Sequence, residues 1–165
     1  MATLKSQREQ IRDQRAFIAE QTDVLQLQRD ELSASAEKRT REQAQAVRLN
    51  PQEDVRARWQ ARGIERVAEV RNESGAAVHD VNVLLGNHAA GGVAVRSFTG
   101  RWGPLQPPPV SRLGPFEVAA FCFFKALGDT APHAFFTDDA ERRWHVSAEG
   151  LLRPAHPGDG FPEPP

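Results

Sequence analysis

Histidine and aspartate are the residues of this chain with which metal-assisted chemistry could be done. His79 and Asp80 are adjacent, and His145 lies in a later apolar segment. Imidazole and carboxylate groups bind divalent cations, which can activate water for hydrolysis. Compact metal sites usually show closely spaced histidines, and no two of the 5 histidines here have that spacing. We therefore predict no metal, no cofactor and no enzymatic activity, and keep a metal-assisted hydrolase at these three residues as the weakest alternative.

Other patterns that carry chemistry are incomplete. Asp138 and Asp139 could bind calcium, but they lack an Asp-x-Asp-x-Asp-Gly loop, so we place them at the tip of a β-hairpin. The sequence has no Gly-x-Ser-x-Gly turn for a serine nucleophile and no glycine loop followed by Lys-Ser/Thr for phosphate. Cys122 lies in the apolar run VAAFCFF without a basic neighbour, which predicts a buried structural thiol.

Trp102 is the residue whose surroundings best predict an exposed contact. It follows Arg101 and is enclosed by Gly100, Gly103 and Pro104, in a proline-rich segment. Large aromatic side chains in loops are common in binding surfaces. A ligand-binding module, with Trp102 and the proline-rich loop as a glycan- or peptide-binding edge, is therefore the second functional hypothesis.

A long polar helix is predicted over residues 1–50, because residues 3–47 lack glycine and proline and are rich in good helix formers. Aliphatic residues recur at every seventh position of this helix: Leu4, Ile11, Ile18, Leu25 and Leu32. A repeat of seven keeps one stripe facing a partner helix in a left-handed coiled coil. Three positions later in each repeat, where leucine would be most stable, the chain has Gln7, Gln14, Gln21 and Gln28.

Three interpretations of this helix remain open. It forms a weak coiled coil, parallel or antiparallel, or it is a largely solvated helix resting on another surface, or it lies on a membrane. A membrane-surface helix is normally basic with a broad apolar face, whereas this stripe is narrow and the charges nearly cancel. Because such a helix is not held by propensity alone, a partner surface is implied. We predict a coiled coil that makes the protein a homo-oligomer, with the five aliphatic residues as its interface.

Charge and targeting signals narrow the class of protein. The 165 residues include 21 basic and 22 acidic ones, a balance that does not favour a nucleic-acid partner. The N-terminal MATLKSQREQIRDQR lacks the apolar run of a signal peptide, and the strongly apolar residues 118–124 are too few to span a bilayer. The single cysteine suits a reducing compartment. We therefore expect a cytoplasmic protein without membrane insertion.

The rest of the chain predicts β-structure. Residues 65–85 alternate apolar and polar side chains around the turn Asn72-Glu-Ser-Gly75, and we expect a hairpin there. Further strands are predicted over residues 93–99, 116–127, 134–137 and 142–147, with the proline-rich segment 100–114 extended along a sheet edge. Short strands separated by turns indicate an antiparallel β-sandwich of immunoglobulin-like type. Its predicted core comprises Val70, Val81, Val83, Val118, Phe121, Phe123, Phe135 and Trp144.

The predicted fold class is α+β, with helix and sheets in separate parts of the chain. The long helix occupies residues 1–50, and residues 51–63 are a linker or short helix. The sandwich occupies residues 64–153, and residues 154–165 are a tail rich in proline and glycine that we expect to be disordered.

Two sequence motifs carry a resemblance to a family. One is Val70-Arg-Asn72-x-Ser74-Gly75-x-x-Val78-x-Asp80-Val81-x-Val83, and the other is Phe136-Thr-Asp138 with Trp144 and Gly150-x-Leu152 downstream. With these, the chain resembles a group of poorly characterised actinobacterial proteins that pair a Gln/Arg/Glu-rich helix with a small immunoglobulin-like β-sandwich. The resemblance covers residues 1–153 and implies a bacterial protein of that architecture. Members often have a membrane segment before the helix, which this sequence lacks, and the resemblance implies no activity.

The functional prediction from the sequence is a non-enzymatic interaction or adaptor protein. Its helix mediates oligomerisation and its β-sandwich docks a protein partner.

Overall fold

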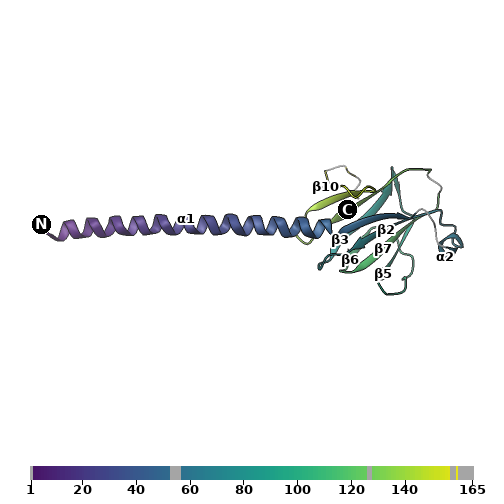
Figure 1. Ribbon diagram of the computed structural model, residues 1–165, viewed down its shortest axis with the longest axis horizontal. Helices are drawn as coiled ribbons and strands as arrows, with labels where there is room; N and C mark the ends of the chain where they lie inside the picture. The colour runs from purple at the N-terminus through teal and green to yellow at the C-terminus, as the bar shows by residue number, and fades with distance from the viewer. Residues whose placement is uncertain (1, 53–56, 126–127, 157–158, 160–165) are drawn as a thin grey trace. The chain divides into compact units, whose positions relative to one another are not determined.

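The computed structural model describes residues 2–52, 57–125, 128–156 and 159. The backbone divides into two compact units, Met1–Arg39 and Thr40–Pro165. The first unit is helical, and the second is built mainly of β-strands (Figure 1). A helix followed by antiparallel sheets confirms the predicted α+β class, with the two kinds of structure in separate parts of the chain.

Helix α1 (Ala2–Gln45) ends earlier than predicted. The Ala46 amide donates to the carbonyl oxygens of Glu42 and Gln43, at 3.2 and 3.1 Å, and strand β1 (Val47–Gln52) begins at the next residue. Residues 47–50 are therefore a strand and not the end of the helix. The reason is a change of period, because Val47 and Leu49 are buried while Arg48 between them is exposed.

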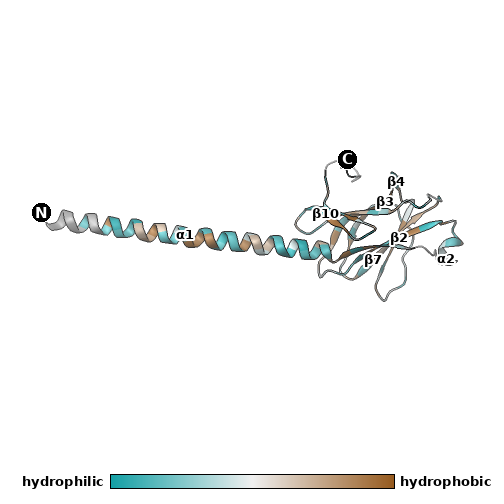
Figure 2. Ribbon diagram, turned by 45° about the horizontal axis from the view of Figure 1, so that its top comes forward, coloured by the Kyte–Doolittle hydropathy of each residue, from teal (hydrophilic) through white to brown (hydrophobic). Residues whose placement is uncertain are grey.

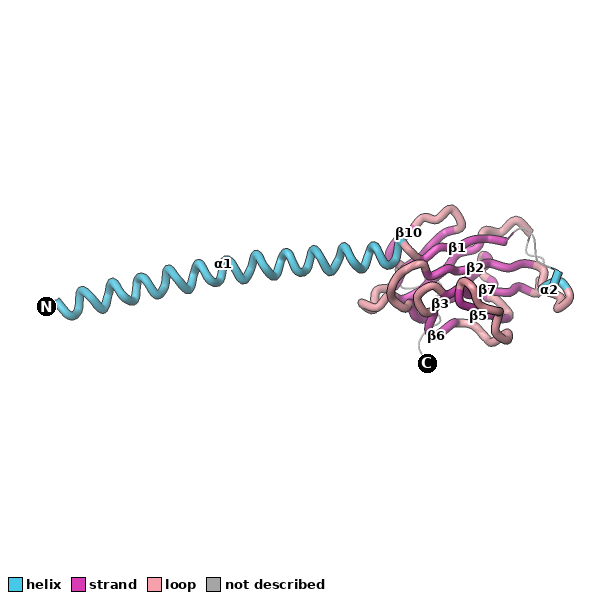
Figure 3. The backbone as a smooth tube through the Cα atoms, turned by 60° about the horizontal axis from the view of Figure 1, so that its bottom comes forward, coloured by secondary structure: helices cyan, strands magenta, loops and turns pink. Residues whose placement is uncertain are grey.

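The first sheet has four strands in the order β1-β2-β7-β5, all antiparallel (Figure 3). Its other strands are β2 (Arg66–Asn72), β5 (Gly92–Ser97) and β7 (Glu117–Phe123). Strand β7 is flanked on both sides, as its continuous apolar sequence predicts for a strand buried on both faces. Pro51 is accommodated because β1 is an edge strand.

The second sheet follows the order β10-β9-β8-β3-β4, and β6 also pairs with β3. Its strands are β3 (Val78–Leu85), β4 (His88–Ala89), β6 (Val110–Leu113), β8 (Pro132–Thr137), β9 (Arg143–Ser147) and β10 (Leu152–Pro154). The predicted hairpin near the C-terminus is confirmed, with Phe135 opposite His145. The short strands β4, β6 and β10 were not predicted, because two to four residues give too little alternation to detect.

The two sheets share one apolar core. Val70 and Phe121 of the first sheet belong to the same buried cluster as Val83 and Phe136 of the second. All of the predicted core residues are at most 7% exposed. Figure 2 shows the apolar positions of this unit concentrated in its strands.

The predicted hairpin over residues 65–85 is wrong in its pairing. Its two strands exist, but β2 belongs to the first sheet and β3 to the second. The turn between them is built on the fully buried Asn72, whose Nδ2 donates to the carbonyl oxygens of Ala76, Leu113 and Gly114 at 2.8–3.1 Å. Its Oδ1 accepts from the amide and the hydroxyl of Ser74. Asn72 therefore fixes a crossover between sheets.

The outer face of the first sheet is also covered. Trp59 of the short helix α2 (Ala57–Gln60) and Ile64 pack on Val67, Ala120 and Cys122 in a second buried cluster. The linker or short helix predicted for residues 51–63 thus contains the last two residues of β1 and all of α2, and its residues 53–56 lie outside the described residues. This cover explains why β2 and β7 are apolar on both faces.

The proline-rich segment runs along β5, as predicted. Val93 and Gln106 exchange two backbone hydrogen bonds of 2.8 and 2.9 Å, and the Gly103 amide donates to the Val95 carbonyl oxygen at 2.9 Å. The segment therefore occupies backbone groups that the edge of the sheet would otherwise offer to another chain.

The predicted tail begins later than residue 154. Pro154 belongs to β10, and Arg153 forms an ion pair with Asp159 at 2.6 Å. Residues 157–158 and 160–165 lie outside the described residues.

Candidate functional site

The repeated aliphatic residues of α1 are exposed to solvent in the single chain. Ile11, Ile18, Leu25 and Leu32 are 50, 61, 64 and 71% exposed, respectively. The side chain of the fifth predicted interface residue, Leu4, lies outside the described residues. The polar surroundings of this row are visible in Figure 2, where hydrophobic positions recur along an otherwise hydrophilic helix.

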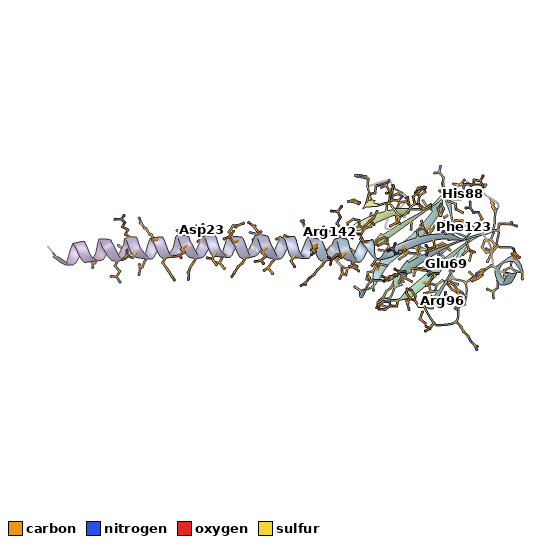
Figure 4. All side chains as sticks on the ribbon, viewed as in Figure 1. Asp23, Glu69, His88, Arg96, Phe123 and Arg142 are labelled. Atoms are coloured by element: carbon orange, nitrogen blue, oxygen red, sulfur yellow. The ribbon has the colours of Figure 1, made fainter. Side chains whose placement is uncertain are left out.

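Neighbouring side chains widen the row in the middle of the helix. Phe17, Val24 and Leu27 are also large, apolar and 48–69% exposed. The glutamines of the repeat, Gln7, Gln14, Gln21 and Gln28, are exposed as well. Figure 4 shows side chains that project both above and below α1. Local hydrogen bonds, such as Gln26 Nε2 to Asp30 Oδ1 at 3.0 Å, stabilise the polar face one turn at a time.

Trp102 is placed by a loop that is fastened to β5 at both ends. The Gly100 amide donates to the Ser97 carbonyl oxygen at 3.0 Å, and Gly103 bonds to Val95. A Cβ atom on Gly100 would lie only 2.4 Å from Ser97 Oγ, so a larger residue here would require the Ser97 side chain to move. The loop therefore holds Trp102 against the outer face of the first sheet.

The Trp102 ring is partly buried and has two close neighbours. Its centroid lies 5.8 Å from that of Trp59 in an edge-to-face arrangement, and Arg96 Cζ stands 4.7 Å from it. The latter is a cation–π distance. Arg96 also donates through Nη1 to the Phe98 carbonyl oxygen at 2.6 Å, which fixes its guanidinium group. Trp102 is thus part of a built cluster as well as the predicted contact residue.

A cleft of about 500 Å³ opens beside this cluster. Its described lining residues are both tryptophans, Arg62, Arg96, Arg101 and two glycines, and none of these is acidic. Such a volume lies within the range of sites for small molecules. The three arginines make the cleft strongly basic although the whole chain carries a net charge of −1. Figure 4 locates Arg96 among the side chains of the β unit.

The three residues of the hydrolase hypothesis are divided between two places. His79 and Asp80 line a cleft beside Asp138 and Asp139, whereas His145 is paired with another histidine on β8 and β9. Within the described part of the chain, no group of three or more His, Cys, Asp or Glu side chains is arranged to hold a metal ion. No observation therefore favours that hypothesis.

Asp138 stabilises the hairpin tip. It is 1% exposed, and its carboxylate accepts from the Ala140 and Arg142 amides at 2.9 Å and from Trp144 Nε1 at 2.7 Å. These bonds use both carboxylate oxygens on the protein itself. The predicted placement at the tip of a β-hairpin is confirmed.

His133 and His145 form a pair across the β8–β9 hairpin. Nδ1 of His133 lies 3.0 Å from Nε2 of His145, and the rings stack with their centroids 5.1 Å apart. Burial lowers the pKa of His145 below its ordinary 6.5, and the positive charge of Arg153 and His133 adds to this effect. The pair therefore disfavours a proton on His145.

Cys122 is a buried thiol, as predicted. It is 0% exposed, its Sγ lies 3.6 Å from the Ala120 carbonyl oxygen, and burial raises its pKa to about 11. A thiol with such a pKa is a poor nucleophile near neutral pH.

Sequence reasoning named Trp102 but missed Trp59, Arg62 and Arg96 as its neighbours. The cluster joins separate segments, and the pairing of both β2 and β5 with β7 brings them together. The histidine pair carried a detectable signal. A hairpin turning at residues 138–141 places positions 133 and 145 diagonally on one face.

Comparisons of the chain with protein-family models, with curated proteins and with solved structures found no match. The resemblance to the actinobacterial group therefore stays a prediction. In the described part of the chain, no helix is both long and apolar enough to cross a membrane.

Proposed function

We propose that this protein is a non-enzymatic assembly or adaptor protein, in which α1 pairs with α1 of a second copy as a coiled coil. The observation that carries the proposal is the aliphatic row, whose members are 50–71% exposed at Ile11, Ile18, Leu25 and Leu32. Burying exposed aliphatic groups of strict seven-residue spacing against a matching helix stabilises the pair. Pairing would join two copies of the β unit in one particle.

The glutamines favour a parallel pair in register. In that arrangement every layer repeats one position from both chains, so aliphatic residues meet aliphatic residues and glutamine meets glutamine. A glutamine amide both donates and accepts, so two facing amides can satisfy each other. In an antiparallel pair each glutamine of the repeat would face an aliphatic layer and lose its hydrogen bonds.

Charge supports the same orientation. Arg15 and Arg29 flank the stripe on the side that follows each glutamine. An antiparallel pair brings this side of one helix against the same side of the other, so arginine would face arginine. A parallel pair places it against the opposite flank, where Gln10 and Val24 stand. The parallel pair therefore avoids like-charge contacts.

Disulfide cross-linking tests this proposal. Gln7→Cys and Gln28→Cys variants should each form a covalent dimer on mild oxidation, because a parallel pair in register brings both like positions within disulfide reach. Ala16→Cys, on the opposite side of the helix, is the matched control and should remain uncross-linked. Cross-linking at neither glutamine position would overturn the pairing. Cross-linking at only one would overturn the parallel register.

We further infer that the β unit is an immunoglobulin-like sandwich. The order β1-β2-β7-β5 corresponds to strands A-B-E-D of that fold, and β9-β8-β3 corresponds to G-F-C. The strand order supports this inference more directly than any sequence motif does, since Trp144 lies on β9 and not on the strand that carries the buried tryptophan of antibody domains.

An exposed aromatic pair supports docking of a protein partner on this unit. Phe116 is 55% exposed and Phe98 38%, with ring centroids 5.9 Å apart. Phe116 has a φ of 57°, a strained conformation for a bulky residue, and its amide is held by the Asn72 carbonyl oxygen at 2.8 Å. The fold thus sustains backbone strain at a residue whose ring faces solvent, a combination typical of functional surfaces.

Phe116→Gly removes the exposed aromatic ring while allowing the backbone to keep its conformation. Glycine accepts the positive φ, so the variant should unfold at the same urea concentration as the parent chain or higher. A partner that binds this surface should co-purify with the parent chain and be lost with the variant. Retention of every co-purifying protein by a folded Phe116→Gly variant would contradict docking at this pair.

A further inference from the structure

The basic cleft beside Trp59 and Trp102 has the composition of a site for a small organic anion. Arg62, Arg96 and Arg101 line it together with the two indole rings. Guanidinium groups bind carboxylate and phosphate oxygens through paired hydrogen bonds, and tryptophan rings form flat apolar walls. Both features meet in one cavity of about 500 Å³.

Arg96 is the arginine of this cleft that the fold holds in place. Its Nε is buried and has no hydrogen-bond partner among the described residues. Buried guanidinium nitrogens are normally paired, because an unpaired one loses its hydration without compensation. The same guanidinium group is held in place by the Phe98 carbonyl oxygen and the Trp102 ring. Arg96 is therefore preorganised, and none of the described residues that line the cleft carries a negative charge to balance it.

The volume of the cleft and the chemistry of its lining residues indicate whether its ligand is a bare ion or a larger molecule. A single phosphate or chloride would fill a small part of about 500 Å³ and would leave the exposed part of the Trp102 ring in contact with water. A ligand with a flat ring would cover this part of Trp102 while its anionic group contacted the arginines. None of the described residues that line the cleft belongs to α1.

We propose that this cleft binds a small organic anion in which a flat ring carries a phosphate or a carboxylate group. The exposed Arg62 and Arg101 contact the anionic group, and the partly buried Arg96 orients it. The partly exposed Trp102 contacts the ring, and the buried Trp59 supports Trp102 through their edge-to-face contact. This site differs in ligand chemistry from the glycan or peptide edge suggested by the sequence, since the cleft is defined by cationic side chains.

Calorimetry with simple probes tests the site. Phenyl phosphate and benzoate supply the ring with either anionic group, inorganic phosphate supplies the anion alone, and benzyl alcohol supplies the ring alone. We expect at least one of the two ring-bearing anions to bind at least tenfold more tightly than inorganic phosphate and benzyl alcohol. The tighter of the two identifies the preferred anionic group. If neither compound binds more tightly than inorganic phosphate, the proposed ring-binding surface is wrong and the cleft binds an adventitious ion only.

Paired arginine variants locate the binding. Arg62→Gln with Arg101→Gln should weaken the tighter probe at least tenfold, and both side chains are exposed, so the fold should persist by circular dichroism. Arg112→Gln with Arg142→Gln removes the same charge from exposed positions outside the cleft and should leave affinity unchanged. Equal affinity in both double variants, or equal loss in both, would overturn the proposal.

Discussion

Replacing Leu25 with glutamine removes one aliphatic layer from the proposed helix pair. Leu25 is 64% exposed in the single chain, so pairing can bury about two thirds of it. Full burial of a leucine contributes about 1.5–3 kcal/mol, so each copy loses about 1–2 kcal/mol and a two-chain layer about 2–4 kcal/mol. At about 1.4 kcal/mol per tenfold change, the dissociation constant should rise by roughly 30-fold to several hundred-fold.

Sedimentation equilibrium over a wide concentration range measures this change directly. Glutamine forms helix about as well as leucine, so the substitution does not disturb the helix itself. Ala16→Gln is the matched control, because position 16 lies on the opposite side of the helix from Leu25. The reasoning is refuted if Leu25→Gln changes the dissociation constant less than threefold, or if Ala16→Gln changes it equally.

Three further predictions concern the stripe, the crossover and the histidine pair. Gln21→Leu adds an aliphatic layer between Ile18 and Leu25 and should tighten association in the same sedimentation assay; unchanged or weaker association would contradict the stripe. Asn72→Ala removes the side-chain donor to the Leu113 and Gly114 carbonyl oxygens and the acceptor of the Ser74 amide, so urea unfolding should show a loss of about 2–4 kcal/mol, whereas the exposed Asn87→Ala should cost little. Because the pKa of His145 is lowered in the folded chain, the unfolded state binds the proton more tightly, and stability should fall as pH drops below about 6.5. Urea titrations at a series of pH values check this, and His145→Phe should flatten the dependence; an equal slope in both proteins would exclude His145 as its source.

The sequence predicts structure best where a periodic pattern is long. The seven-residue repeat of α1 and the alternation of Val81 and Val83 extend over enough residues to identify a helix and a strand. The core followed from the same alternation. These are local properties of the chain, and local reasoning recovers them.

Long-range pairing is where the sequence was insufficient. The turn at Asn72 has the composition of a hairpin turn, and only its hydrogen bonds to Leu113 and Gly114, about forty residues away, make it a crossover between sheets. Strand β1 was not predicted from the sequence for a related reason. Its pairing with β2, as in Leu49 opposite Val70, overrides the helical composition that precedes it.

The two candidate sites also differ in how well the sequence predicts them. The aliphatic row could be read from spacing alone, because one helix carries all of it. The cleft at Trp102 could not, since Arg62 and Trp59 reach it from a segment that was predicted only as a linker or short helix. Arginines scattered along a chain of balanced charge give no sign that three of them line one cavity.

The mass of the unmodified chain in solution tests the central claim most directly. Light scattering coupled to size-exclusion chromatography should give a mass that rises with loading concentration from that of the 18.3 kDa chain toward twice that value. A mass that stays at 18.3 kDa at every concentration, up to the highest that remains soluble, would contradict the pairing of α1 with a second copy.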